Sequence, residues 1–220
     1  MAHVVLTGSN RGIGLALCRQ FQERGDEVTA TCRTTSEALD ALGVNVQTGI
    51  DVTSDAAVAD LVDRLQGTPI DRLVLCAGIL QRQTLDHLDI EGIRTQFEVN
   101  ALGPLRMSAA LAPSIPAGGS IAIITSRMGS IADNTSGGGY GYRMSKAAVN
   151  MAGRSLAHDL RDRGIAVSLL HPGWVQTDMT GHSGQVDAET SARGLIARMD
   201  ELTLSTTGTF WHAQGDPLPW

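Results

Sequence analysis

Residues 4–14 read Val4-Val5-Leu6-Thr7-Gly8-Ser9-Asn10-Arg11-Gly12-Ile13-Gly14. The opening apolar residues predict a short buried strand, and residues 15–23 repeat apolar side chains at helical spacing. Glycines between a strand and a helix let the backbone turn sharply and approach a phosphate, which the free N–H groups of the helix can bind. The spacing G-x-x-x-G-x-G differs from the usual G-x-G-x-x-G, but the flanking strand and helix favour a nucleotide-binding loop.

The rest of the chain continues to alternate strands with helices. Further strands are predicted at Glu27–Cys32, Val44–Ile50, Asp71–Leu75, Ser120–Thr125, Ile165–Leu170 and Thr207–Phe210. Helices are predicted at Asp55–Leu65, Asp89–Leu111, Lys146–Leu160 and Ala188–Met199. This pattern predicts a single α/β domain over residues 1–220, a Rossmann-like, doubly wound parallel sheet of about seven strands with helices on both faces.

Composition excludes several classes of partner. The chain of 220 residues carries a formal net charge of -6, so neither nucleic acid nor an acidic membrane surface is the expected partner. Cys18, Cys32 and Cys76 are far apart in the sequence and form no metal-ligand pattern, so we predict no metal site and read them as small buried residues. With no signal core and no apolar run long enough to span a membrane, the expected location is cytoplasmic.

The end of the second predicted strand indicates which dinucleotide binds. Sites for NAD usually place Asp or Glu there to hold the ribose hydroxyls, whereas sites for NADP place arginine near the 2′-phosphate. Here the strand ends at Arg33, and Arg11 lies in the glycine-rich loop nearby. We therefore predict NADP(H) in preference to NAD(H), the alternative being that Arg33 is only a solvated arginine. Asp51 follows the third strand, where a carboxylate could meet an adenine amino group.

Lys146 is the only lysine of the chain, and it stands four residues after Tyr142. The helical spacing places both side chains on one helix face. A cation about 5 Å from a tyrosine hydroxyl favours the phenolate by roughly 3 kcal/mol, or about two pKa units, at an effective dielectric near 20. This predicts a lowered pKa for Tyr142 and a tyrosine that exchanges protons near pH 7. The alternative is a surface lysine that happens to lie near a tyrosine.

Two more polar residues are candidates for the same site. Ser126 follows the fifth strand, at the sheet edge where parallel sheets bind ligands. Asn100 lies in the middle of a long predicted helix, where asparagine is a mediocre helix former. Tyr140 and Ser130 compete for the roles of Tyr142 and Ser126. Tyr140 has Met144 rather than a cation four residues later, and Ser130 stands further from the strand end, so both are less favoured.

Together these motifs resemble the short-chain dehydrogenase/reductase family over essentially the whole chain, and more narrowly the C-factor and sniffer-type carbonyl reductases. Asn100, Ser126, Tyr142 and Lys146 match the family's catalytic tetrad. The resemblance and the residues together give the candidate cofactor contacts Gly8, Asn10, Arg11, Gly12, Ile13, Gly14, Arg33, Asp51, Val52, Ala77, Gly78, Tyr142, Lys146, Pro172, Gly173, Val175 and Thr177. The family often has Asn-Asn-Ala-Gly after the fourth strand, whereas this chain has Leu75-Cys76-Ala77-Gly78, so other groups must replace the asparagine hydrogen bonds.

The resemblance implies an NADP(H)-dependent oxidoreductase that interconverts a ketone or aldehyde and an alcohol. Ser126 would hydrogen-bond the substrate carbonyl and Tyr142 would donate its proton. Lys146 would contact the nicotinamide ribose, and Asn100 would hold a water. The family implies a small-molecule substrate, a short substrate loop near 179–187, and a homodimer or homotetramer. The alternative is a cofactor-binding signalling protein of the C-factor type with little turnover.

Overall fold

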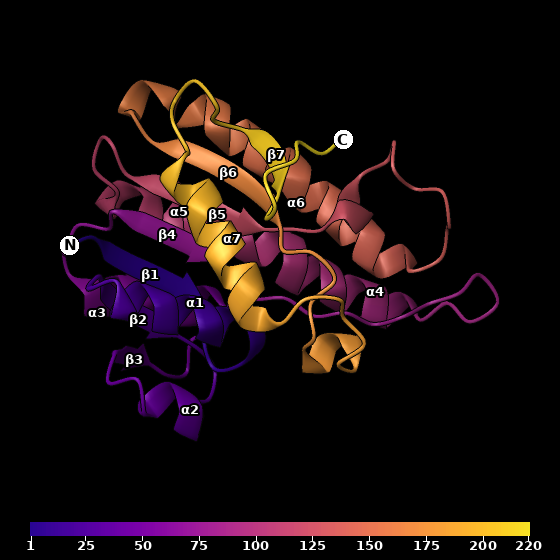
Figure 1. Cartoon of the computed structure of the whole chain (residues 1–220), viewed down its shortest axis with the longest axis horizontal. Helices are drawn as coiled ribbons and strands as arrows, with labels where there is room; N and C mark the ends of the chain where they lie inside the picture. The colour runs from indigo at the N-terminus through magenta and orange to yellow at the C-terminus, as the bar shows by residue number, and fades with distance from the viewer.

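The computed structural model describes all residues 1–220 and shows one seven-stranded sheet (Figure 1). The strand order is β3-β2-β1-β4-β5-β6-β7, and every neighbouring pair is parallel. This confirms the predicted doubly wound sheet, because the order reverses direction between β1 and β4. The strands are β1 (His3–Thr7), β2 (Glu27–Thr31), β3 (Asn45–Gln47), β4 (Arg72–Leu75), β5 (Ser120–Ile124), β6 (Ala166–His171) and β7 (Thr209–His212).

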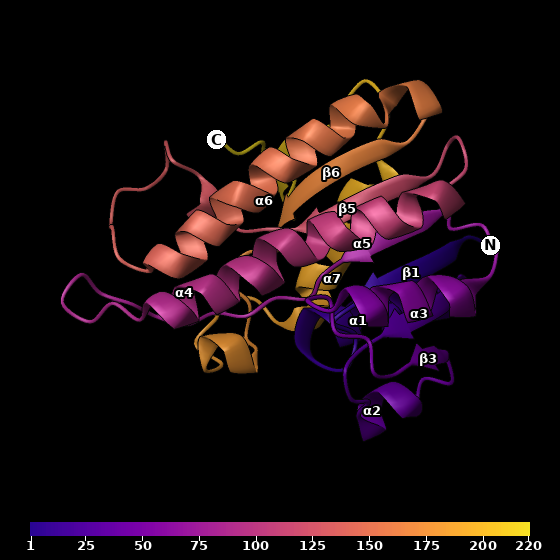
Figure 2. The same cartoon turned by 180° about the vertical axis from the view of Figure 1, so that it is seen from behind.

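Helices cover both faces of the sheet, as Figures 1 and 2 show from opposite sides. One face packs against α1 (Gly12–Glu23) and α7 (Ala188–Asp200), whose apolar side chains meet alternate residues of the strands in one core cluster. The other face packs against α3 (Asp55–Leu65), α5 (Gly103–Leu111) and α6 (Tyr140–Asp159) in a second cluster. The alternation of side chains along each strand thus supplies two separate cores.

The predicted helix Asp89–Leu111 is not continuous. It divides into α4 (Ile90–Phe97), a π-helical turn at Glu98–Leu102, and α5. Asn100 lies inside that turn, where its side chain bonds the backbone of Ile79 instead of pointing to solvent. A π-turn widens the helix locally and often marks a functional site.

Other boundaries shift by a few residues. The tyrosine helix α6 begins at Tyr140 and includes Tyr142, as the predicted shared helix face of Tyr142 and Lys146 requires. The edge strand β3 is shorter than predicted because it pairs with β2 alone. A short helix α2 (Glu37–Asp40) was not predicted, and Ser36 caps it by accepting a hydrogen bond from Leu39 N. No helix has the length and apolar character needed to cross a membrane.

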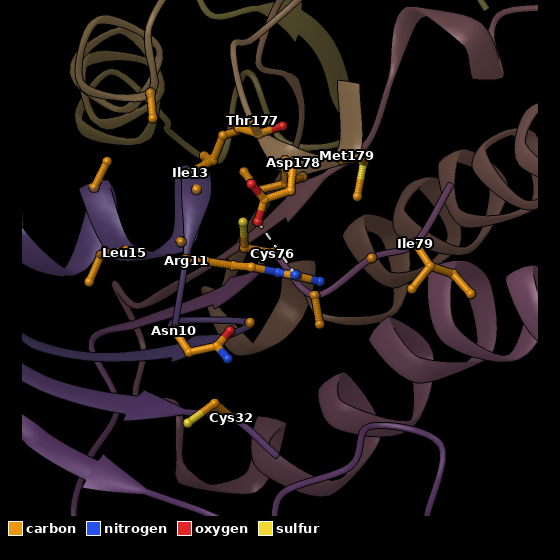
Figure 3. A pocket seen from close by; sticks show the side chains of 18 of the residues that line it. Asn10, Arg11, Ile13, Leu15, Cys32, Cys76, Ile79, Thr177, Asp178 and Met179 are labelled. Carbon is orange, nitrogen blue, oxygen red and sulfur yellow. Dashed lines mark ion pairs between the residues drawn. The ribbon is translucent and has the colours of Figure 1, made fainter. Parts of the chain in front are cut away.

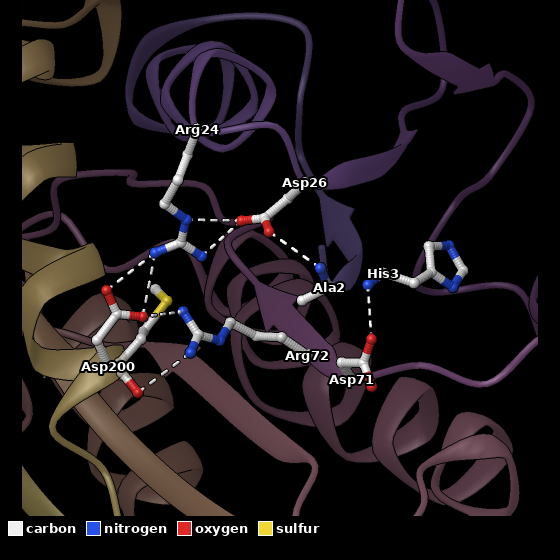
Figure 4. Close-up of polar contacts among 8 residues, drawn as sticks. Ala2, His3, Arg24, Asp26, Asp71, Arg72 and Asp200 are labelled. Atoms are coloured by element: carbon white, nitrogen blue, oxygen red, sulfur yellow. Dashed lines mark hydrogen bonds and ion pairs between the residues drawn. The ribbon is translucent and has the colours of Figure 1, made fainter.

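A polar network fixes the end of the sheet opposite the strand carboxyl ends (Figure 4). Asp200, at the end of α7, accepts hydrogen bonds from Arg24 and Arg72, and Arg24 also pairs with Asp26. Asp26 in turn accepts from the backbone N–H of Ala2 at 3.0 Å. These contacts tie α1, α7 and β4 together at the amino ends of the strands and leave the carboxyl ends free for a ligand.

Candidate active site

A cavity of about 1120 Å³ opens at the carboxyl ends of the strands (Figure 3). Every candidate site residue lines it except Asn100, Ser126, Gly173 and Val175. The residues that do line it are Gly8, Asn10, Arg11, Gly12, Ile13, Gly14, Arg33, Asp51, Val52, Ala77, Gly78, Tyr142, Lys146, Pro172 and Thr177. Because this volume exceeds that of most single-ligand pockets, it suits a long ligand with a small second molecule beside it.

The glycine-rich loop forms the part of the cavity wall at the start of α1. Gly8 has a φ of +72°, and a Cβ there would lie 2.8 Å from Ala77 Cα. A Cβ on Gly14 would overlap the carbonyl oxygen of Gly8. Arg11, at the N-cap of α1, makes no side-chain cap, so the N–H groups of the first helical turn are available to an anion. The loop therefore fits a pyrophosphate, as its sequence predicts.

The Thr7 side chain holds the segment after β4, where the family often has asparagines. Its Oγ1 accepts hydrogen bonds from the backbone N–H groups of Cys76 and Ala77, each at 3.1 Å. The chain after β4 is thereby attached to β1 directly beside Gly8. Cys18, Cys32 and Cys76 are all free thiols; Cys76 is only half-buried, contrary to the prediction, and it lines the cavity together with Cys32.

Tyr142 and Lys146 lie on the same buried face of α6, which confirms their predicted arrangement. The Lys146 Nζ stands 5.7 Å from the centroid of the Tyr142 ring and donates a hydrogen bond to Ile124 O at 2.9 Å. Both side chains are buried, with Tyr142 9% and Lys146 5% exposed. A surface lysine beside a tyrosine is therefore excluded.

The predicted lowering of the Tyr142 pKa is wrong for this structure. Burial raises the pKa of Tyr142 to about 12, and the neighbouring Ser126 hydroxyl opposes this shift only in part. Burial also lowers the pKa of Lys146 to about 8. The Coulomb argument from sequence left out desolvation, which disfavours both charged forms. In addition, the ammonium is held by Ile124 O and not by the phenol oxygen.

We expect a Lys146→Met variant to be more stable, relative to wild type, at pH 7 than at pH 10. The folded lysine has a pKa of about 8, below its ordinary value of 10.5. The unfolded chain therefore binds the proton more tightly, and the wild type gains stability as pH rises between those values, by at most about 3 kcal/mol. Methionine does not titrate. Urea unfolding of both proteins at each pH measures the difference, and an equal difference at both values would contradict the expectation.

The Asn100 side chain holds the segment that follows β4 by hydrogen bonds. Its Oδ1 accepts from Ile79 N at 2.9 Å, and its Nδ2 donates to Ile79 O at 2.9 Å and to Ser145 Oγ at 3.1 Å. The side chain is fully buried beneath Gly78, where an added Cβ would lie 3.3 Å from Asn100 Oδ1 and 3.8 Å from Lys146 Nζ. Asn100 thus lies beside the lysine, and its role in holding a water stays a prediction.

Ser126 lies just beyond β5 and is buried. Its Oγ accepts a hydrogen bond from Met128 N at 3.1 Å, which begins the short 3-10 helix Arg127–Gly129. The competing Ser130 instead accepts from Asp133 N. The Ser126 side chain acts to lower the pKa of Tyr142, whereas Ser130 has no such effect, which favours Ser126 over Ser130.

The structure adds Thr34, Ser36 and Asp178, which sequence reasoning missed, to the wall of the cavity. Asp178 faces Arg11 across the cavity at 3.5 Å, as Figure 3 shows. Asn10 Nδ2 donates to Thr34 O at 2.9 Å, and Ser36 Oγ donates to Asn10 O at 2.7 Å. These bonds link the glycine-rich loop to the segment that carries Arg33. Of these, only Asp178 could have been found from the sequence, because it adjoins Thr177, a candidate cofactor contact.

Hydrogen bonds join the predicted substrate-loop segment, near 179–187, to the chain that follows β6. Trp174 O accepts from Gln185 N at 2.7 Å, and the Trp174 indole donates to Ser183 O at 2.8 Å. Val175 is buried and forms an isolated bridge with Val186. Among nearby apolar side chains, Met179 lines the cavity, whereas Met128 and Trp174 do not.

Comparison with curated proteins finds relatives that match all or most of the chain. A 1-hydroxy-2-glutathionyl-2-methyl-3-butene dehydrogenase of Rhodococcus sp. (strain AD45) is 42% identical, with 100% of both chains covered. The C-signal protein of Myxococcus xanthus is 46% identical over 69% of this chain and 93% of its own.

Two solved structures are also similar to the whole chain. The carbonyl reductase Sniffer of D. melanogaster has a TM-score of 0.90 at 29% identity, covering 100% of both chains. A carbonyl reductase of Pseudomonas aeruginosa PAO1 in complex with NADP has a TM-score of 0.89 at 35% identity, also covering 100% of both. These matches confirm the resemblance to C-factor and sniffer-type carbonyl reductases.

A family model described as short chain dehydrogenase matches residues 2–187, most of the chain. No cluster of three or more His, Cys, Asp or Glu side chains is placed to hold a metal ion. The sheet with its switch point between β1 and β4, the glycine-rich loop and the buried tyrosine–lysine pair agree with that match. The chain therefore belongs to the short-chain dehydrogenase/reductase family, whose members are oxidoreductases acting on C=O and CH–OH groups.

Proposed function

We propose that this protein is an NADP(H)-dependent carbonyl reductase or alcohol dehydrogenase that uses Ser126, Tyr142, Lys146 and Asn100. One observation carries the proposal: Tyr142 and Lys146 form a buried pair on the wall of the cavity that also holds the glycine-rich loop. A pure structural role gives no reason to bury the chain's only lysine there, because burying an ammonium costs free energy.

In the proposed reaction, Ser126 donates a hydrogen bond to the substrate carbonyl oxygen, and the Tyr142 hydroxyl gives that oxygen a proton. With its pKa raised to about 12, Tyr142 carries its proton at neutral pH, which is the form that a proton donor needs. A nicotinamide cofactor held here would supply the hydride in reduction and accept it in oxidation. Lys146 would bind the nicotinamide ribose, and its cation would stabilise the tyrosinate that remains. Asn100 holds the segment after β4 against the lysine.

A screen for NADPH oxidation tests the proposal. Wild-type protein is mixed with NADPH and a panel of aldehydes and ketones, and the absorbance of NADPH is followed. The glutathione conjugate named for the Rhodococcus relative belongs in the panel as an alcohol, assayed by NADP⁺ reduction. Turnover that disappears in the Tyr142→Phe variant supports the proposal.

A second candidate function follows from the similarity to C-signal. In that case the chain binds the dinucleotide as a signalling protein, and turnover is incidental. Tight NADPH binding together with silence across the whole panel would favour this reading over the enzyme.

NADP(H) is the proposed cofactor in preference to NAD(H). Arg33 and Arg11 both line the cavity, and the NADP-bound Pseudomonas reductase is a close structural neighbour. Asp51, at the same end, accepts hydrogen bonds from the backbone and hydroxyl of Thr53, which together with Arg33 hold the pKa of Asp51 below its usual range. An ionised Asp51 is then available as an acceptor for the adenine amino group.

An Arg33→Gln variant should bind NADPH about 10- to 100-fold more weakly, since a charge-assisted hydrogen bond to a phosphate is worth about 1.5–3 kcal/mol. Binding of NADH should change by no more than about twofold, because it has no 2′-phosphate. Cofactor fluorescence titration measures both. The exposed Arg82→Gln variant, outside the cavity, is the control. Wild-type protein that binds NADH as tightly as NADPH would contradict the cofactor assignment.

We also propose that the protein forms a homodimer or homotetramer through α6 and the helical segment from α4 to α5 that contains Asn100, which lie side by side in Figure 2. Leu105, Met144 and Met151 are 39%, 53% and 67% exposed on these helices, and such apolar side chains gain from burial at an interface. Sedimentation that shows only monomer would contradict this. A cytoplasmic location stays a prediction.

A further inference from the structure

The helix that carries Tyr142 is capped by a residue outside that helix. The N-cap residue of α6 is Gly139, which has no side chain and therefore makes no side-chain cap. The backbone carbonyl of Gln83 accepts a hydrogen bond from Gly139 N at 3.0 Å, and Gln83 Oε1 accepts one from Gly141 N at 3.3 Å. The first four N–H groups of a helix have no partner within it, and the N-cap side chain usually binds the second or third of them. Gln83, 58 residues before Gly141, takes over that role for α6.

The backbone before α6 explains why an outside group is needed. Gly137, Gly138 and Gly139 have φ values of +63°, +64° and +57°, a left-handed conformation that residues with side chains rarely adopt. An ordinary N-cap residue instead has an extended backbone, from which its own side chain can reach the helix. The start of α6 therefore depends on Gln83 for the hydrogen bond that a capping side chain would otherwise make.

Gln96, on α4, holds Gln83 in place. Its Nε2 donates to Gln83 Oε1 at 3.4 Å, and its Oε1 accepts from Gln81 N at 2.9 Å. Gln83 is only 4% exposed, and Gln96 is fully buried. A Cβ on Gly141 would overlap Gln96 Nε2 and lie 3.1 Å from Gln83 Oε1, so both amides pack directly against the first turn of α6. Because the site is buried, removing one amide would leave its partners without a hydrogen bond, which costs free energy.

Gln96 also holds part of the cavity wall. It bonds the N–H of Gln81, which directly follows Ile79 and Leu80, and both of those residues line the cavity. Tyr142 lines the same cavity. The buried amides thus connect this part of the wall to the turn of α6 that carries the tyrosine.

We propose that Gln83 and Gln96 are positioning residues for Tyr142: Gln83 caps the turn of α6 that holds the tyrosine, and Gln96 holds Gln83 against that turn. Neither glutamine lines the cavity, so both would act through Tyr142 and not on the substrate or the cofactor. This inference rests on the proposed oxidoreductase function, in which Tyr142 is the acid. Tyr142 is the third residue of α6, within the turn that frays first when its N–H groups lack partners.

Substitutions of Gln83 test the cap by turnover of an aldehyde or ketone that wild type reduces with NADPH. Gln83→Met keeps the length of the side chain and removes the acceptor, so kcat should fall by about 10- to 100-fold, the usual effect of displacing a reacting group by about 1 Å. Gln83→Glu keeps an acceptor next to the positive end of the helix, so its kcat should stay within about threefold of wild type. Gln96→Met leaves Gln83 able to bond α6 and should lose less, about 3- to 10-fold. NADPH affinity should change by no more than about threefold in all three, because the glycine-rich loop is untouched.

A double substitution separates positioning from a general loss of stability. If Gln83 acts through the Tyr142 hydroxyl, adding Gln83→Met to Tyr142→Phe should lower the residual single-turnover rate by no more than about twofold. The same large loss in both backgrounds would overturn the proposal, and so would a wild-type kcat in Gln83→Met. Ser54→Ala is the matched control, because Ser54 caps α3 by accepting from Ala57 N at 3.2 Å and lies outside the cavity. It should lower the unfolding temperature and leave kcat unchanged.

Amide hydrogen exchange tests the cap without turnover. In Gln83→Met the Gly141 N–H loses its partner, so it should exchange about 10-fold or more faster than in wild type. Gln83→Glu and Ser54→Ala should keep the wild-type rate at Gly141. A wild-type rate there in Gln83→Met would overturn the proposal whatever the turnover. If wild type turns over no carbonyl compound, the proposed function itself fails, and the exchange rate still decides whether Gln83 caps α6.

Discussion

The Tyr142→Phe variant is expected to lose turnover by roughly 10²- to 10⁴-fold, the usual contribution of a positioned acid. Phenylalanine keeps the ring that packs in this buried site and removes only the hydroxyl. NADPH binding should therefore stay within about twofold of wild type, and the whole loss should appear in kcat. Single-turnover NADPH oxidation and fluorescence titration measure the two quantities on the same sample.

Tyr140→Phe is the matched control, because Tyr140 begins the same helix and has Met144 rather than a lysine four residues later. Its turnover should match that of wild type. If Tyr140→Phe lost turnover and Tyr142→Phe kept it, the assignment of the acid to Tyr142 would be wrong. If Tyr142→Phe retained full activity and Tyr140→Phe did too, the proposed mechanism would fail.

The Gly14→Ala variant is expected to weaken NADPH binding by at least about 100-fold. The added methyl would overlap the Gly8 carbonyl oxygen, a backbone atom that cannot turn aside, so the loop must shift. Overpacking of this kind typically costs about 1–3 kcal/mol of stability. The shift also moves the first-turn N–H groups of α1 away from the pyrophosphate they are expected to bind. Fluorescence titration with NADPH and thermal unfolding record both effects.

The Gly67→Ala variant is the control for Gly14→Ala, because it strains the backbone at a position outside the glycine-rich loop. Gly67 has a φ of +71° and open space around its Cβ position, so alanine there should reduce stability and leave NADPH affinity unchanged. Gly14→Ala with wild-type NADPH affinity would show that the loop does not bind the pyrophosphate.

Much of the site could be predicted from the sequence because its parts are local. Gly8, Gly12 and Gly14 lie on one turn between β1 and α1, and Tyr142 and Lys146 are separated by one turn of α6. Short-range spacing of this kind fixes which face a side chain occupies. The strands were predicted well for the same reason, since each is a short apolar run bounded by turn residues.

Other features depend on segments far apart in the chain. Thr7 bonds the segment after β4 because β1 and β4 are neighbours, which brings its hydroxyl to the N–H groups of Cys76 and Ala77. The Arg11–Asp178 pair joins the glycine-rich loop to the loop after β6. His171 and His212 meet only because β7 adds to the sheet beside β6. No spacing rule in a single sequence links such positions.

The sequence by itself determined the alternation of strands and helices, the cofactor loop and the tyrosine–lysine pair, since each depends on the geometry of one or two successive elements. Only the tertiary structure decided the protonation of that pair. Its pKa values follow from how completely neighbouring elements exclude water, and burial outweighs the attraction between ammonium and phenolate. Tertiary structure also decided what surrounds Ser126, because strand order, which brings β5, β6 and β7 together, is a property of the packed sheet.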